Sequence, residues 1–479
     1  MKISERFNLN KTQFELDFVD IDTDKDTRLF LDPYFISKCD FPFTRNAHDT
    51  LRSYFENLLA LLRGNHIEEA KEVFSHLGET NDICLGMSSG QPGGHGMGPE
   101  DTKKIFERLL ESRALATGVL EDLEDFRIFA PNVDKDKVSD MTANIIRKHL
   151  IEYTQDQCNL LGIPLQENVP SGMYWDSINL QWQNEYTQRL VINGAPILLV
   201  PKRVVSFSDK YTQGIYRQHF VLNFLRNEHL RLRGPLVMRR KNGDRYVTKK
   251  SIKNNEPAMS KEYLVHFTQR HPEIFGDFKQ SVGNLIKPVE GNVYEEINVN
   301  SVCATLTDAL HSMPAGSETA SAYHQLMIGI LELLVYPNLS SPKKELEIHQ
   351  GRKRIDIAFN NSAETGFFFR LPSQSHITCP FVFVECKNYS REIVNPELDQ
   401  MGGRFSYQRG RFGIIACRSI DNMNLFIKRC SDTHRDDRGL IIPIVDEDIF
   451  EALEHYPELE YCSFETILER RFRQIIIQN

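Results

Sequence analysis

The C-terminal third of the chain carries a regular succession of apolar patterns. Residues 317–335 repeat apolar side chains at helical spacing, which predicts an amphipathic helix. Short apolar runs bounded by turn residues predict strands at 345–349, 352–359, 381–389, 412–417 and 440–445. Asn395-Pro396 supplies a cap and a proline for a helix over 397–406. The predicted order is helix, three strands, helix and strand, with one further strand at the end.

Two of these predicted strands carry charged side chains inside apolar runs. Period two places Glu385 and Lys387 on one face of the strand 381–389, with Phe383 and Tyr389. A neighbouring strand can bring Asp356 to the same point. An apolar strand tolerates such charges only where they are paired. Two carboxylates beside an ammonium group are suited to binding a divalent metal.

This arrangement resembles the PD-(D/E)xK nuclease superfamily over roughly residues 301–450. The resemblance rests on an aspartate in one strand and Glu-x-Lys on the next, within the expected order of elements. It implies a restriction-endonuclease-like αβββαβ core in the C-terminal domain. Together with the helix-rich and mixed α/β domains predicted upstream, this gives a multi-domain α/β (α+β) protein as the expected fold class. The implied activity is metal-dependent hydrolysis of DNA phosphodiester bonds.

The resemblance also implies the ligands of the metal and the role of the lysine. Asp356 and Glu385 would hold Mg²⁺ or Mn²⁺, with the backbone carbonyl of Cys386 as a further ligand. Lys387 would orient or deprotonate the attacking water and offset charge in the transition state.

Family members often add an acid from the first helix and a polar residue from the helix after the lysine strand. The candidates here are Glu332 and Gln400. Arg404 lies four residues after Gln400 on the same helix face, and we expect it to contact the scissile phosphate.

Two other interpretations of this segment stay open. The Glu385–Lys387 pair can belong to a surface strand without chemistry, or the domain can be an inactive relative that retains the fold for binding. The insertion of about twenty residues between the two charged strands, which contains Phe367-Phe368-Phe369, is either an edge hairpin or a partner surface.

Positive charge is concentrated upstream of this domain. The whole chain has a net charge of −9, yet Lys and Arg dominate residues 202–253. Asn242-Gly243 between apolar residues predicts a type I′ β-hairpin, and four of its basic residues are candidate DNA contacts: Arg239, Arg240, Lys241 and Arg245. The alternatives are a solvated basic face or an intramolecular partner for acidic domains.

The upstream residues divide into two further predicted units. Residues 1–165 form a helix-rich regulatory or sensor domain, 166–300 a mixed α/β domain with the basic hairpin and a linker, and 301–479 the nuclease domain.

Two segments of the first unit resemble ligand loops without matching them. The acidic run 20–26 lacks the glycine and the bidentate glutamate of a calcium loop, so it predicts an Asx-rich turn. The glycine-rich segment Gly86–Gly98 lacks a phosphate-loop signature, so a connector is the default, with ligand binding left open.

Composition narrows the class of protein. The 479 residues are 41% hydrophobic, and no apolar run approaches the length of a membrane span. Because the N-terminus also lacks the apolar core of a signal peptide, we expect a cytoplasmic protein without a membrane partner. The nine cysteines form no Cys-x-x-Cys pair, which favours reduced thiols.

The upstream residues and the nuclease resemblance together suggest a prokaryotic antiphage or restriction-type defence effector that acts on DNA, with RNA not excluded. We expect residues 1–300 to restrain or direct the nuclease core within a homo-oligomer, in response to a phage-derived trigger. Two alternatives remain: a DNA-repair or recombination nuclease, and a non-catalytic nucleic-acid-binding or scaffold protein.

Overall fold

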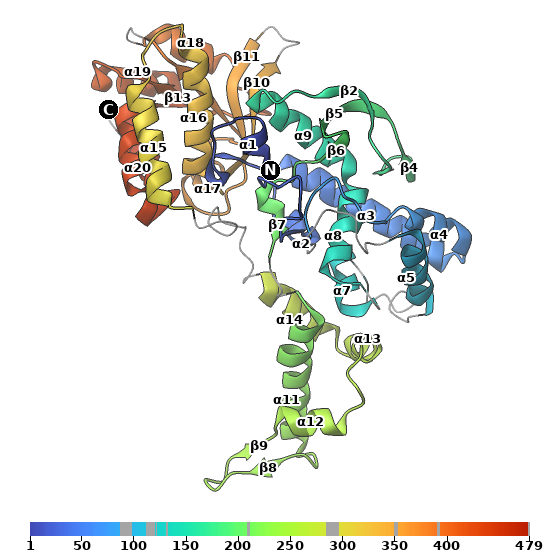
Figure 1. Ribbon diagram of the computed structural model, residues 1–479. Helices are drawn as coiled ribbons and strands as arrows, with labels where there is room; N and C mark the ends of the chain where they lie inside the picture. Colours follow the sequence, from blue (N-terminus) through green and yellow to red (C-terminus); the bar gives the residue numbers. More distant parts are fainter. Residues whose placement is uncertain are drawn as a thin grey trace.

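The chain folds into three parts, as the computed structural model in Figure 1 shows. The structure describes residues 1–86, 98–111, 120, 122–130, 133–207, 211–283, 297–348, 353–389 and 393–477. Residues 1–207 form an upstream module, 211–283 an arm that projects from it, and 297–477 a C-terminal module. With 54% of residues in helices and 16% in strands, the predicted mixed α/β class is confirmed. Within the described ranges, no helix is long and apolar enough to cross a bilayer.

The C-terminal module contains a five-stranded sheet of order β10-β11-β12-β13-β14. Its strands are β10 (Leu339–Ile348), β11 (Lys353–Asn361), β12 (Phe381–Lys387), β13 (Phe412–Cys417) and β14 (Leu440–Val445). The first three strands pair antiparallel, and β12, β13 and β14 pair parallel. Parallel strands need crossover connections, which α18 and α19 provide. The helices are α15 (Val299–Ser312), α16 (Ala320–Val335), α17 (Gly366–Ser373), α18 (Asn395–Gly402), α19 (Met423–Arg435), α20 (Asp446–Leu459) and α21 (Cys462–Ile477).

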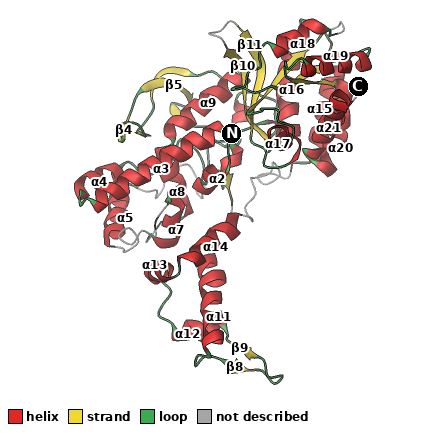
Figure 2. Ribbon diagram, turned by 180° about the vertical axis from the view of Figure 1, so that it is seen from behind, coloured by secondary structure: helices red, strands yellow, loops and turns green. Residues whose placement is uncertain are grey.

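The sheet and α16 form one core because their apolar faces meet. Every residue of α16 from Met327 to Val335 is buried, as expected of a helix enclosed on all sides. The insertion between β11 and β12 is not an edge hairpin, because it contains α17, whose Phe367 and Phe368 are buried. Figure 2 shows this module from the opposite side.

The upstream module is mainly helical. Its helices include α1 (Ile3–Arg6), α2 (Pro33–Lys38), α3 (Pro42–Arg63), α4 (Ile67–Ser75), α5 (Pro99–Glu111), α7 (Phe126–Phe129), α8 (Lys135–Ile145) and α9 (Arg147–Leu161), with 3-10 turns η1 (Gln13–Glu15), η2 (Leu123–Asp125) and η3 (Lys202–Val204). Its short strands are β1 (Phe30–Leu31), β2 (Gln166–Pro170), β3 (Tyr174–Asp176), β4 (Gln181–Gln183), β5 (Tyr186–Ile192), β6 (Ala195–Ile197) and β7 (Val205–Ser206). One hydrophobic cluster extends from Ile3 to Val282, so the arm base shares this core.

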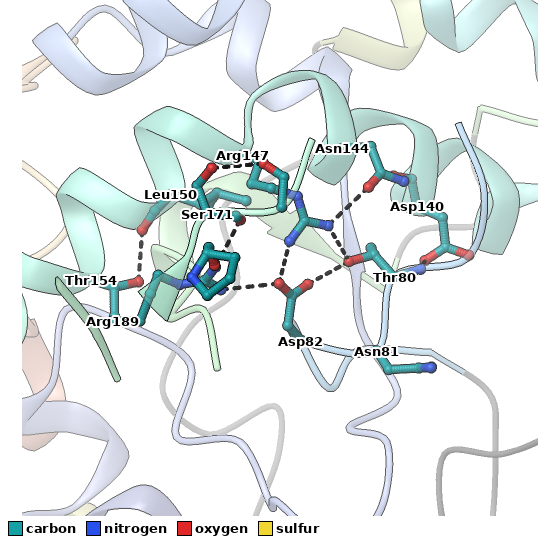
Figure 3. Close-up of polar contacts among 12 residues, drawn as sticks. Thr80, Asn81, Asp82, Asp140, Asn144, Arg147, Leu150, Thr154, Ser171 and Arg189 are labelled. Atoms are coloured by element: carbon teal, nitrogen blue, oxygen red, sulfur yellow. Dashed lines mark hydrogen bonds and ion pairs between the residues drawn. The ribbon is translucent and has the colours of Figure 1, made fainter. Parts of the chain in front are cut away.

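A buried ion cluster ties the small sheet β2-β5-β6 to α9 (Figure 3). Asp82 pairs with Arg147 at the start of α9 and with Arg189 on β5, the latter at 3.1 Å from Nη2 to Oδ2. Burial raises the pKa of Asp82, but Arg147, the Thr80 hydroxyl and Arg189 outweigh it and hold the pKa below its ordinary value. The cluster therefore fixes the packing of three segments that are distant in sequence.

The arm consists of α10 (Gln213–Ile215), the π-helical turn η4 (Tyr216–Val221), α11 (Leu222–Leu232), α12 (Lys249–Asn255), α13 (Lys261–Arg270), α14 (Pro272–Gly283) and the hairpin β8 (Met238–Arg239) and β9 (Arg245–Tyr246). An aromatic cluster holds its base, where the Tyr216 ring lies 5.2 Å from Phe275 and 5.1 Å from Phe278. The continuous helix from Gln213 to Leu232 is about 30 Å long. The hairpin lies at the far end of the arm (Figures 1 and 2).

Two predicted boundaries in the C-terminal module are wrong. The strand predicted from residue 345 begins at Leu339, and the helix predicted to 406 ends at Gly402. In the upstream module, α8 and α9 are separate helices because the backbone leaves helical geometry at Ile146. Of the glycine-rich segment, residues 87–97 lie outside the described part of the chain.

Candidate active site

Strand register brings the predicted carboxylates together. In the antiparallel pair β11–β12, Ile357 lies opposite Val384, so the next position places Asp356 opposite Glu385. Opposed residues on adjacent strands project from the same face of the sheet. The backbone N–H of Cys386 donates a 3.0 Å hydrogen bond to Oδ2 of Asp356, which fixes that carboxylate against β12.

Lys387 and Glu385 form a buried ion pair on this face. Their side chains are 9% and 2% exposed, and Nζ of Lys387 lies 2.7 Å from Oε1 of Glu385. The same Nζ donates a 3.3 Å hydrogen bond to Oε1 of Gln400 on α18. Both charges are tolerated inside the sheet because each has an opposite partner.

Arg404 is the second cation of the cluster. It follows α18, is 5% exposed, and its Nη1 makes an ion-pair contact with Oε2 of Glu385. That oxygen accepts no hydrogen bond from any described donor. Burial lowers the pKa of Arg404, and the nearby Asp356 opposes this effect. Arg404 is therefore held against the carboxylates.

The thiol of Cys386 is not part of this cluster. Period two turns it to the opposite face of β12, toward Tyr323 on α16. Burial, then the charge of Asp356, raises the pKa of the Cys386 thiol well above its ordinary value, so the thiol stays protonated. Only its backbone carbonyl remains as the predicted metal ligand.

Glu332 lies elsewhere, and its assignment to the catalytic site is wrong. It is 1% exposed near the C-terminal end of α16, and its Oε1 lies 3.0 Å from Nζ of Lys202 in the upstream module. Burial raises the pKa of Glu332 to about 7, against the opposing influence of Lys202. Glu332 belongs to the contact between the two modules, which sequence spacing alone does not reveal.

The cluster fits a hard divalent cation through oxygen donors. Asp356 and Glu385 supply two carboxylates on one face, and Oε2 of Glu385 lacks a hydrogen bond. No group of three His, Cys, Asp or Glu side chains that could hold a metal occurs among the described residues. Coordination would therefore have to be completed by a carbonyl, water or substrate oxygen, which is how Mg²⁺ is usually held.

The basic hairpin exists, but its predicted turn type is wrong. A type I′ turn needs positive φ at both central residues, and only Gly243 has it, at 88°. The loop is instead closed by the bonds Gly243 N to Arg240 O and Arg240 N to Asp244 O, at 2.9 and 2.8 Å. Four basic side chains at this tip are exposed: Arg239, Arg240, Lys241 and Arg245.

The hairpin and the carboxylate cluster lie far apart in the molecule. The helix α18, which carries Gln400, is at the top of both views, and β8 and β9 are at the bottom (Figures 1 and 2). The arm therefore does not contribute residues to the cluster of its own chain.

Sequence reasoning missed the polar contact between modules. Besides Lys202, Arg203 donates a 2.8 Å hydrogen bond from Nη2 to the Ser362 carbonyl, and Asp17 Oδ1 accepts one of 3.0 Å from Ser341 N. Only the adjacent basic pair Lys202-Arg203 in an apolar setting, Ile197 to Val205, signals these contacts in the sequence.

One model of a described family matches part of the chain. Residues 8–212 match a domain of unknown function, DUF8370. This match covers the upstream module and ends where the arm begins. No curated protein and no solved structure matches the chain.

Proposed function

We propose that the C-terminal module is a metal-dependent nuclease of the PD-(D/E)xK superfamily that hydrolyses DNA phosphodiester bonds. The observation that carries the proposal is the meeting of Asp356, Glu385 and Lys387 on one face of β11 and β12. The element order α16-β10-β11-β12-α18-β13 supports it, because it is the αβββαβ order of that superfamily.

The residues have separate tasks in this proposal. Asp356 and Glu385 would hold Mg²⁺ or Mn²⁺, which when bound would polarise the phosphoryl oxygen and lower the pKa of a water. Lys387 holds a positive charge beside Glu385 where the attacking oxygen and the transition-state charge would lie. Gln400 positions the Lys387 ammonium through its Oε1. Arg404 leaves Glu385 and binds the phosphate.

The exposed arm supports nucleic acid as the substrate. Within the described chain no ion pair neutralises Arg239, Lys241 or Arg245, so their charges are available to phosphates. Since the hairpin and the carboxylates lie at opposite ends, one nucleic acid must be long to touch both, or a second copy of the chain must bring them together.

The experiment compares folded variants on defined substrates. Supercoiled, linear and single-stranded DNA are incubated with wild type, Glu385→Gln and Lys387→Met, in Mg²⁺, Mn²⁺ or EDTA. Cleavage should require metal and be lost in both variants. Asp399→Asn, an exposed carboxylate of α18 that pairs with Arg438, is the matched control and should cleave normally. Full cleavage by folded Glu385→Gln would refute the proposal.

Binding by the arm is tested separately. Reversing the charges of Arg239, Arg240, Lys241 and Arg245 should weaken DNA binding and flatten its salt dependence by roughly 0.9 in log–log slope per lost contact. Fluorescence anisotropy across salt measures this. An unchanged slope would show that the hairpin is a solvated face.

We further propose antiphage defence in the cytoplasm, by a homo-oligomer, as the setting of this activity, on resemblance alone. A repair or recombination nuclease is the competing role. Cleavage of closed circular DNA favours defence, whereas a strict requirement for free ends favours repair.

A further inference from the structure

A cavity lies between the upstream module and the sheet that carries the carboxylates. It has a volume of about 300 Å³, at the lower end of the range of small-molecule sites. The helices α3 and α9 form one side, and β10, β11 and the start of β12 form the other. Its lining therefore includes strands that also carry Asp356 and Glu385.

The floor of this cavity contains an unsatisfied polar group. Ser341 lines the cavity, is 6% exposed, and its Oγ has no hydrogen-bond partner among the described residues. Asp17 binds Ser341 N at 3.0 Å and the Tyr153 hydroxyl at 2.6 Å, so these two groups are satisfied while the Ser341 hydroxyl is not. A buried polar group left unpaired costs about 1–3 kcal/mol.

The backbone at this serine is also unusual. Ser341 has φ of 48°, in the left-handed region, and lies in a bulge of β10 between Ser340 and Lys343. Bulges redirect side chains and are common next to functional sites, and strained residues cluster at ligand sites. The orphaned hydroxyl and the strained backbone occur at the same residue, which is the pattern of a ligand-binding position.

The walls and rim define the chemistry of the ligand. Phe43 and Phe381 form apolar walls, and the Phe43 ring lies 5.7 Å from that of Tyr153. At the rim, Asp156 Oδ2 pairs with Lys343 Nζ at 2.6 Å, and Glu152 adds a second carboxylate. Aromatic walls favour a flat ring, and two carboxylates against one lysine disfavour a phosphate group.

We propose that this cavity binds an uncharged heteroaromatic compound of nucleoside size. The ring packs against Phe43 and Phe381, and its polar edge bonds the amide of the buried Asn360. The Ser341 hydroxyl is closed to solvent in the free chain, and it bonds the ligand after rotation of the Ser341 side chain. Because both modules line the site, the ligand stabilises their contact. This proposal does not depend on nuclease activity, since its readout is binding.

The test uses adenosine, guanosine, cytidine and uridine as probes of the full-length chain by titration calorimetry. At least one should bind wild type, and its 5′-monophosphate should bind more weakly. Ser341→Ala should weaken binding roughly tenfold, from loss of one hydrogen bond. Ser340→Ala is the control, because its Oγ bonds that of Ser362 outside the cavity lining.

Two further variants separate binding from folding. Ala358→Leu fills the cavity from β11, and Phe43→Ala removes a half-buried wall from the other module. Both should abolish or strongly reduce binding while circular dichroism and thermal unfolding show a folded chain. The proposal is overturned if no nucleoside binds wild type at millimolar concentration, if only the phosphorylated forms bind, or if the folded cavity variants bind normally.

Discussion

Arg404 and a bound metal ion would compete for the same oxygen of Glu385, and this competition can be measured. Its Nη1 contacts Oε2 of Glu385, the oxygen that a metal would need, while Lys387 retains Oε1. Replacing Arg404 by methionine keeps an apolar stem of similar length and removes the charge. The substitution should therefore tighten divalent-metal binding and reduce cleavage, because the same arginine is proposed to hold the phosphate.

The size of the effect follows from the contact that the metal must displace. An opposite charge within about 4–6 Å stabilises an ionised carboxylate by roughly 1–2 pKa units, which corresponds to about 1.4–2.8 kcal/mol. Since 1.4 kcal/mol corresponds to a tenfold change in affinity, Mn²⁺ should bind Arg404→Met roughly tenfold to a hundredfold more tightly. Without metal, the variant should be less stable than wild type, because one oxygen of the buried Glu385 loses its cation.

Titration calorimetry with Mn²⁺ and thermal unfolding with and without the metal measure both effects. Arg438→Met is the control, because Arg438 is 45% exposed and pairs with Asp399 on α18, outside the carboxylate cluster. Its affinity should equal that of wild type. If Arg404→Met binds Mn²⁺ no more tightly than wild type and gains no extra stability from it, Arg404 does not compete with the metal.

Two stability predictions test the buried charges outside the site. Lys202→Met should destabilise the protein by about 3–5 kcal/mol in urea unfolding, because it leaves Glu332 buried and unpaired; Lys343→Met, which breaks a pair 45% and 36% exposed, should change stability by less than about 1 kcal/mol. Burial, and then the charge of Asp136, raises the pKa of Asp140 to about 8 from an ordinary 3.8. Between these two pH values the folded state keeps a proton that the unfolded state releases. The stability of wild type should therefore fall as pH rises from about 4 to 8, by up to about 1.4 kcal/mol per pH unit. Asp140→Asn should flatten this dependence, and an equal slope in thermal unfolding across pH would contradict it.

The sequence predicted the last two strands of the C-terminal sheet well, because their signal is local, whereas β10 begins six residues before its predicted start. The bounds of β13 and β14 agree with the apolar runs, since strands buried on both faces read as continuous apolar segments. The meeting of Asp356 with Glu385 required only strand alternation and an antiparallel neighbour. The alternation of side chains along β11 and β12 was therefore enough to predict both the strands and the proposed site.

The errors arise where tertiary contacts override local pattern. The spacing of α16 could not distinguish a carboxylate facing the site from one facing Lys202, more than a hundred residues earlier. Similarly, the Asn242-Gly243 dipeptide predicts a two-residue turn, but the five-residue connection between Arg239 and Arg245 changes which residues are central. The nearby sequence therefore determines neither the direction of the Glu332 side chain nor the type of the hairpin turn.

The buried pair between Lys202 and Glu332 also decides how control by the upstream residues can be tested. A fragment that begins near residue 301 would remove Lys202 and Arg203 and leave a glutamate that is 1% exposed in the whole chain without its cation. If such a fragment were inactive, misfolding of α16 would explain the result as well as loss of regulation would. Variants of the cavity wall, such as Phe43→Ala, alter the same contact between modules without exposing the buried charge. Control exerted through the upstream module should therefore be sought in the full-length chain.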